Sequence, residues 1–179
     1  MEAGASIERF FASGVTALEE KLGPINWQFA TTKKFDPEDF GAFLALLPKS
    51  ADGVALRHAV EVRNDTFRTP TFVELARAHG VAIVIAGDSG FPQIADLTAP
   101  FVYARIMGTR ENEARGYSDE ALDAWARRAG IWASGGSPDD LAPLAPQTSA
   151  DGREVFLYVI SGFKALNPLA AVALIEKVA

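Results

Sequence analysis

The feature that most constrains the fold is an uninterrupted apolar run, V-A-I-V-I-A, at residues 81–86, directly after the helix-ending Gly80. A run of strand length with no polar position suits a strand that is buried on both faces. Strands of this kind occur in parallel sheets that are covered by helices, and right-handed crossovers join their neighbours. The run therefore predicts an α/β fold in which strands alternate with helices.

The rest of the chain supplies this alternation. Further strand patterns occur at residues 25–29, 57–63, 101–106 and 154–160, and helical patterns with start and stop signals occur at residues 6–22, 36–47, 70–79, 118–132 and 167–178. Together they predict a parallel sheet of about five strands. A complete barrel of this type has eight strands and typically ~250 residues, whereas this chain has 179. We therefore expect one domain, residues 1–179, whose parallel sheet does not close into such a barrel.

Two connections depart from the pattern. Residues 87–100 are rich in turn formers and predict at most one helical turn, at residues 94–97. Residues 134–152 consist mainly of Gly, Ser, Pro, Ala and Asp, and they are long for a connection inside a compact domain. We interpret residues 134–152 as an irregular surface excursion.

The composition argues against several classes of function. The net charge is -6 and the pI is near 4.9, so the chain as a whole repels phosphate backbones, which disfavours non-specific nucleic-acid binding but leaves room for a local basic pocket. The absence of cysteine excludes disulfides and cysteine-ligated metals. The sequence shows neither a basic-then-apolar leader nor a long apolar run, which predicts a cytoplasmic protein that does not enter a membrane.

The strand at residues 57–63 carries the strongest candidate site. Its alternation puts Ala59, Glu61 and Arg63 on one face, so that two opposite charges lie near the end of the strand. In parallel α/β folds, ligands bind at the C-terminal edge of the strands. Strands that end at this edge are expected to bring together six side chains: Gln28, Glu61, Arg63, Asp88, Tyr103 and Arg105.

Two interpretations of this group stay open. In the first, Arg63 and Arg105 hold a carboxylate or phosphate while Glu61 acts as acid, base or orienting group. In the second, the same three residues form a buried structural ion network.

Other polar residues are weaker candidates. Lys164 lies near the start of the last helix, where Asn167 is the predicted cap, and the positive helix end favours an anion there. An exposed loop lysine is the simpler interpretation. His58 and His79 each stand alone and predict no metal site.

Five motifs in order along the chain resemble those of the YecE-like family, domain of unknown function 72. They are Q-F at 28–29, F-D-P at 35–37, R-H-A-V-E-V-R at 57–63, F-V-Y-A-R at 101–105 and G-Y-S-D-E-A-L at 116–122. The resemblance implies a TIM-like barrel from which the first three strand-helix units are missing, and it implies no particular activity or cofactor. Asn64, Met107 and Ser161 replace residues typical of the family, including the histidines best suited to proton transfer near neutral pH.

The residues thus favour a site that binds a small anionic or phosphorylated ligand, with a non-catalytic structural or interaction remnant as the alternative and nucleic-acid binding least favoured. A sheet that does not close also leaves the strand at residues 25–29 with an unpaired edge. We expect a homodimer to cover that edge, in preference to residues 6–22 or 134–152 of the same chain.

Overall fold

The computed structural model describes residues 2–147 and 150–179, and its strands are nearly all parallel. One sheet has the order β1-β4-β5 and a second has the order β6-β7-β8, with parallel pairing throughout. The strands are β1 (Ile25–Gln28), β4 (His58–Glu61), β5 (Ala82–Ile83), β6 (Ile85–Gly87), β7 (Phe101–Ile106) and β8 (Glu154–Val159). Only Val84 separates β5 from β6, and its N–H donates to the carbonyl of Val60 at 2.9 Å, so the two sheets are continuous along the chain.

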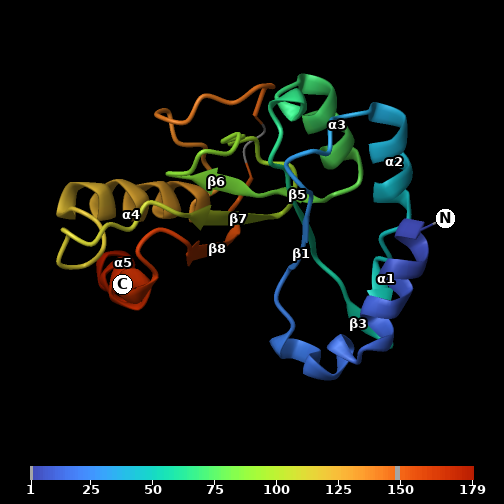
Figure 1. The fold of residues 1–179 in the computed structure, drawn as a ribbon, viewed down its shortest axis with the longest axis horizontal. Coiled ribbons are helices and arrows are strands. Elements are labelled where there is room, and N and C mark those ends of the chain that lie inside the picture. The colour runs from blue at the N-terminus through green and yellow to red at the C-terminus, as the bar shows by residue number, and fades with distance from the viewer. Residues whose placement is uncertain (1, 148–149) are drawn as a thin grey trace.

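Helices cover the sheet in two groups (Figure 1). They are α1 (Glu2–Ala12), α2 (Pro37–Ala45), α3 (Pro70–Ala78), α4 (Asp119–Ala133) and α5 (Asn167–Val178). Figure 1 shows α4 and α5 beside β6 to β8, whereas α1 to α3 lie toward the β1 end of the molecule. The predicted caps form: Asp36, Thr69 and Ser118 each accept a backbone N–H three residues on, which starts α2, α3 and α4. The prediction of an α/β fold with parallel strands is confirmed, and the described strands form no closed barrel.

The alternation of side chains divides the sheet into two faces. Val60, Val62 and Ile83 pack with Phe40 and Phe72 on one side, under α2 and α3. Farther along the same side, residues of β7 pack on α4 and α5; the cluster includes Ala104, Ile106, Leu122, Trp125, Trp132 and Leu174. The opposite side, which we call the arginine face, carries Asn26, Gln28, Ala59, Glu61, Tyr103, Arg105, Phe156 and Tyr158. Its small apolar cluster is built from sheet and loop residues.

Several local predictions are wrong in an instructive way. Residues 6–22 are not one helix, because α1 ends at Ala12 and Gly14, with a φ of 85°, turns the chain into the 3-10 helix η1 (Val15–Lys21). Residues 94–97 form no helical turn. The Asp52-Gly53 turn closes a hairpin of β2 (Ser50–Ala51) and β3 (Val54–Ala55) that the sequence analysis lacks. Two further 3-10 turns are η2 (Asp65–Phe67) and η3 (Lys164–Leu166).

The segment 134–152 has no helix or strand among its described residues, but one carboxylate fixes part of it. Asp96 is 1% exposed, and its carboxylate accepts hydrogen bonds from the backbone N–H groups of Leu144 and Ala145 and from Nε2 of Gln147, at 2.9–3.1 Å. Gln147 in turn accepts from the N–H of Leu97 at 2.9 Å. Asp96 therefore ties residues 144–147 to the connection between β6 and β7.

The described part of the chain contains no helix with the length and hydrophobicity that a bilayer crossing requires.

A buried histidine at the start of β4 joins this strand to β1. The ring of His58 accepts the indole N–H of Trp27 at Nδ1 (3.1 Å) and donates from Nε2 to the carbonyl of Pro48 (2.7 Å). This pattern requires the neutral ring, because a proton on Nδ1 would face the indole N–H. Burial, which outweighs the hydrogen bond to Pro48, lowers the pKa of His58 below its ordinary value.

The first prediction concerns the dependence of stability on pH. Since the folded state lowers the pKa of His58, the unfolded chain binds the proton first as the pH falls. We expect the free energy of unfolding to decrease from pH 7.5 downward through about 6.5, by at most ~1.4 kcal/mol per pH unit for one proton. Urea unfolding at a series of pH values measures this slope. The variant His58→Gln should have a flatter profile in that window, and identical profiles would contradict the assignment.

Candidate functional site

The arginine face contains a buried carboxylate shared by two guanidinium groups. Glu61, at the end of β4, is 0% exposed. Its Oε1 accepts from Nε and Nη2 of Arg63 at 3.0 and 2.8 Å, and its Oε2 pairs with Nη1 of Arg105 and accepts from Nδ2 of Asn26 at 3.1 Å. Glu61 is thus held by four hydrogen bonds from three residues on three different segments of the sheet.

Arg105 reaches Glu61 across an intervening strand. Arg105 lies on β7, and its register partner on β6 is Ala86. Register partners point to the same face of a sheet, and the small alanine side chain leaves room for the long guanidinium side chain to extend toward β4. Gln28, the register partner of Glu61 on β1, completes the group, because its Oε1 accepts from Nη2 of Arg63 at 2.7 Å and from Nη1 of Arg105 at 3.3 Å.

The two arginines retain unused donors. Within residues 2–147 and 150–179, neither Nη1 of Arg63 nor Nε and Nη2 of Arg105 donates a hydrogen bond to the protein. Their side chains are 22% and 19% exposed, and two guanidiniums against one carboxylate leave one formal positive charge on the cluster. Burial lowers the pKa of Arg105, although a guanidinium stays charged at neutral pH. The cluster therefore presents charged donors that have no partner in the described protein.

Two neighbours add to the chemistry of the cluster. The guanidinium carbon of Arg63 lies 4.4 Å from the ring centroid of Phe91, which holds the arginine in a cation-π contact. Oδ1 of Asn26 is buried without a hydrogen-bond partner in the described structure. A buried amide oxygen without a donor is costly, so Asn26 adds an unused acceptor beside the unused donors.

Tyr103 lies on the same face as Arg105, two residues earlier in β7. Its ring centroid is 5.1 Å from that of Tyr158 and 6.5 Å from that of Phe156, both on β8. Burial raises the pKa of Tyr103, and the nearby Tyr158 adds to the effect, so the phenol is protonated at neutral pH. Tyr103 is therefore part of an aromatic row next to the cluster, and within the described residues its hydroxyl makes no hydrogen bond to Glu61 or the arginines.

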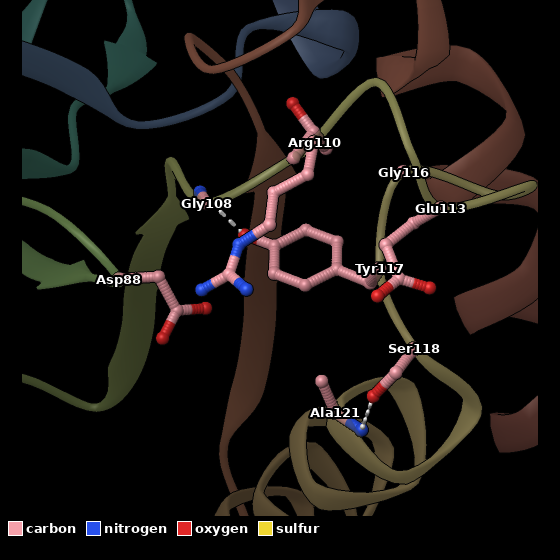
Figure 2. A pocket seen from close by; sticks show the side chains of 9 residues that line it. Asp88, Gly108, Arg110, Glu113, Gly116, Tyr117, Ser118 and Ala121 are labelled. Carbon is pink, nitrogen blue, oxygen red and sulfur yellow. Dashed lines mark hydrogen bonds between the residues drawn. The ribbon is translucent and has the colours of Figure 1, made fainter.

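Asp88 does not join the cluster. It follows β6 with a φ of 52° and accepts the indole N–H of Trp125 at 2.7 Å, on the α4 side of the sheet. There it lines a cavity of about 600 Å³ at the ends of β6 and β7 (Figure 2). The other lining residues are Gly108, Thr109, Arg110, Glu113, Gly116, Tyr117, Ser118 and Ala121.

Acidic side chains, the guanidinium of Arg110 and the buried phenol of Tyr117 line this cavity together. Figure 2 shows Asp88, Arg110 and Tyr117 around the cavity, and the hydroxyl of Tyr117 accepts the N–H of Gly108 at 2.7 Å. Burial is the main cause that raises the pKa of Tyr117. The loop after β6 contributes to the cavity and to the arginine cluster, because Asp88 lines the cavity while Phe91 packs on Arg63.

Lys164 also stays apart from the cluster. It is exposed and begins η3, and its side chain makes no hydrogen bond or ion pair with the described residues. The predicted cap Asn167 does not cap α5, since the N-cap position is Leu166 and Oδ1 of Asn167 instead accepts the hydroxyl of Thr109 at 2.7 Å. The tertiary contact with Thr109 takes the oxygen that a cap would use.

The structure thus brings together Gln28, Glu61, Arg63 and Arg105, places Tyr103 beside them, and separates Asp88 and Lys164. The sequence analysis missed Phe91 and Tyr158 as neighbours. Alternation within residues 154–160 puts Phe156 and Tyr158 on one face, so the pattern held a signal for Tyr158, whereas the irregular loop around Phe91 held none. In the described ranges, no group of three or more His, Asp or Glu side chains is arranged to hold a metal ion.

Comparison with known proteins agrees with the resemblance to the YecE-like family. The family described as "Protein of unknown function DUF72" matches residues 1–179. The crystal structure of a DUF72 family protein from Thermotoga maritima aligns with a TM-score of 0.64 and 18% identity, covering 96% of this chain and 62% of that one. Two crystal structures of a DUF72 family protein from Enterococcus faecalis align with TM-scores of 0.66 and 0.69 at 15% and 16% identity, covering 95% and 98% of this chain.

These likenesses support the fold and leave the chemistry to the residues themselves. The chain spans 62–66% of the length of these solved proteins. No curated protein matches the chain. The family match over the whole length, together with the order of strands and helices, leads to one conclusion: the chain belongs to the DUF72 family.

Proposed function

We propose that the protein binds a small anionic ligand at the C-terminal ends of its strands, with Arg63 and Arg105 as the anion-binding residues and Gln28 beside them. One observation carries this proposal: two partly exposed guanidiniums share a single carboxylate and keep donors that the described protein does not use. Charged donors of this kind bind carboxylate and phosphate oxygens strongly, because a guanidinium presents paired N–H groups.

Glu61 acts in this proposal as the orienting group. Among the described residues its carboxylate contacts only hydrogen-bond donors, and it is fully buried, so it holds both guanidiniums in place and leaves no exposed oxygen for a ligand. Preorganised charges bind an anion more tightly than mobile side chains, because the entropy of ordering them has already been lost. The excess positive charge is confined to this cluster, since the whole chain has a net charge of -6.

The second prediction tests anion binding by thermal unfolding with phosphate, sulfate and small carboxylates. A ligand at a hundredfold excess over its Kd stabilises by ~2.7 kcal/mol, which for a chain of this size raises the Tm by roughly 5–10 °C. Arg63→Ala should abolish this increase, measured relative to the Tm of the variant without ligand. Arg9→Ala, which removes the same charge from α1, should keep it. The proposed anion binding is contradicted if none of these anions raises the Tm of the wild type.

We propose further that the strands form part of a TIM-like barrel and that two chains associate. Their order along the chain, their parallel pairing and the helices on one face support the partial barrel. Within the described residues β1 pairs only with β4 and β8 only with β7, so each has a free edge. Free edges of parallel strands favour association with another chain.

The third prediction is therefore a homodimer at micromolar concentration, measured by light scattering after size exclusion. Hydrogen exchange should show protection of the outward N–H groups of β1 that increases with protein concentration. A monomer with the same protection at every concentration would contradict the dimer and would assign the cover of β1 to segments of its own chain.

A further inference from the structure

Aromatic side chains continue the anion-binding cluster along the same face of the sheet. Tyr158 on β8 is the register partner of Arg105, so the two side chains lie on neighbouring strands about 4.8 Å apart and point to the same face. Tyr158 is 41% exposed. Its ring packs at 5.1 Å against Tyr103, and Tyr103 packs at 6.5 Å against Phe156. An exposed ring thus stands directly beside a guanidinium that has unused donors.

The ring of Tyr158 is held in place before any ligand binds. Contacts with Tyr103 support it on one side, and the β8 backbone is paired with β7 from Phe101↔Glu154 to Ile106↔Val159. A tyrosine with few rotatable bonds in a fixed strand offers a large contact area at a low cost in conformational entropy. Such a surface is suited to stacking against a planar group.

The free donors distinguish a phosphate from a carboxylate. Nη1 of Arg63 and Nε and Nη2 of Arg105 belong to two different guanidiniums, and a single fork already satisfies the two oxygens of a carboxylate. A phosphate monoester has three terminal oxygens and can accept from both arginines at once. Its fourth oxygen is then free to carry an organic group toward β8.

We propose that the ligand is a phosphate monoester that carries a planar aromatic ring, the chemical class to which nucleoside monophosphates belong. The phosphate binds Arg63 and Arg105, and the ring stacks on Tyr158. This inference rests on the proposed anion binding and adds the substrate class. It follows from two adjacent features that one ligand would satisfy together: unused guanidinium donors and an exposed, supported aromatic ring.

The experiment compares four phosphate-bearing probes by isothermal titration, namely inorganic phosphate, ribose 5-phosphate, phenyl phosphate and adenosine 5'-monophosphate, and adds adenosine as a probe without phosphate. Wild type should bind the two ring-bearing esters roughly tenfold or more tightly than inorganic phosphate, the range expected for stacking on one aromatic side chain. Tyr158→Ala should remove this preference and leave the affinity for inorganic phosphate unchanged, whereas Tyr158→Phe should keep it. The control Leu169→Ala truncates an exposed apolar side chain elsewhere, on α5. It should change neither the affinity for inorganic phosphate nor that for the ring-bearing esters.

The outcomes separate this inference from the proposal beneath it. Equal affinity for the four phosphate-bearing probes, with loss of binding in Arg63→Ala, would contradict ring stacking on Tyr158 and would support the anion site alone. Equal binding of adenosine and adenosine 5'-monophosphate would overturn the role of the phosphate. No binding of any probe would overturn both.

Discussion

Replacement of Asp96 by alanine is expected to lower the free energy of unfolding by about 3 kcal/mol or more. Asp96 is 1% exposed and accepts from two backbone N–H groups and one side-chain amide of the segment 144–147. Each buried donor left without an acceptor costs about 1–3 kcal/mol, and the lost acceptor is charged, which strengthens the bonds. Urea unfolding measures the change.

The excursion 134–152 supplies its own control. Asp139 lies in this excursion, is exposed, and its side chain makes no hydrogen bond or ion pair with residues 2–147 or 150–179, so Asp139→Ala should change the stability by less than about 0.5 kcal/mol. Limited proteolysis should also cut Asp96→Ala within this segment faster than wild type, since the anchor of residues 144–147 is gone. Equal stability of the two variants would contradict the anchoring role of Asp96.

Glu61→Gln is expected to cost about 3 kcal/mol. Removal of one partner from a buried ion pair typically costs ~3–5 kcal/mol, and we take the lower end because the two arginine side chains are 22% and 19% exposed. A matched control is Glu154→Gln, because Glu154 also pairs with an arginine, Arg57, but its side chain is 59% exposed. Exposed pairs contribute about 0–1 kcal/mol, so the two variants should differ clearly in urea unfolding.

The same variant distinguishes the two interpretations of the cluster. Glu61→Gln adds one formal positive charge, which by itself would strengthen anion binding. If Glu61 orients the guanidiniums of a binding site, the affinity for phosphate should nevertheless fall, because the fixed geometry is lost. An unchanged affinity together with the loss of stability would favour a structural ion network. Arg105→Gln combined with Glu61→Gln should cost less than the sum of the single changes, because the two residues are in contact.

Local chemistry was enough to predict most of the helices and strands and which residues share a face of the sheet. The strand β7 and the caps Asp36, Thr69 and Ser118 lie where the pattern predicts them, because alternation and capping depend on residues within a few positions. Alternation alone also placed Glu61 and Arg63 on one face, as their hydrogen bonds require.

Only the tertiary structure decided which of these groups meet. Arg105 reaches Glu61 because strand order puts the small Ala86 beside it, and no local pattern contains that information. Asp88 turns away toward Trp125, and Asp96, which the sequence analysis did not single out, is buried by a segment nearly fifty positions later. Short-range periodicity predicts which residue types lie on the face of the candidate site. Which of these residues meet depends on contacts between distant segments, and these contacts form only when the strands and helices pack together.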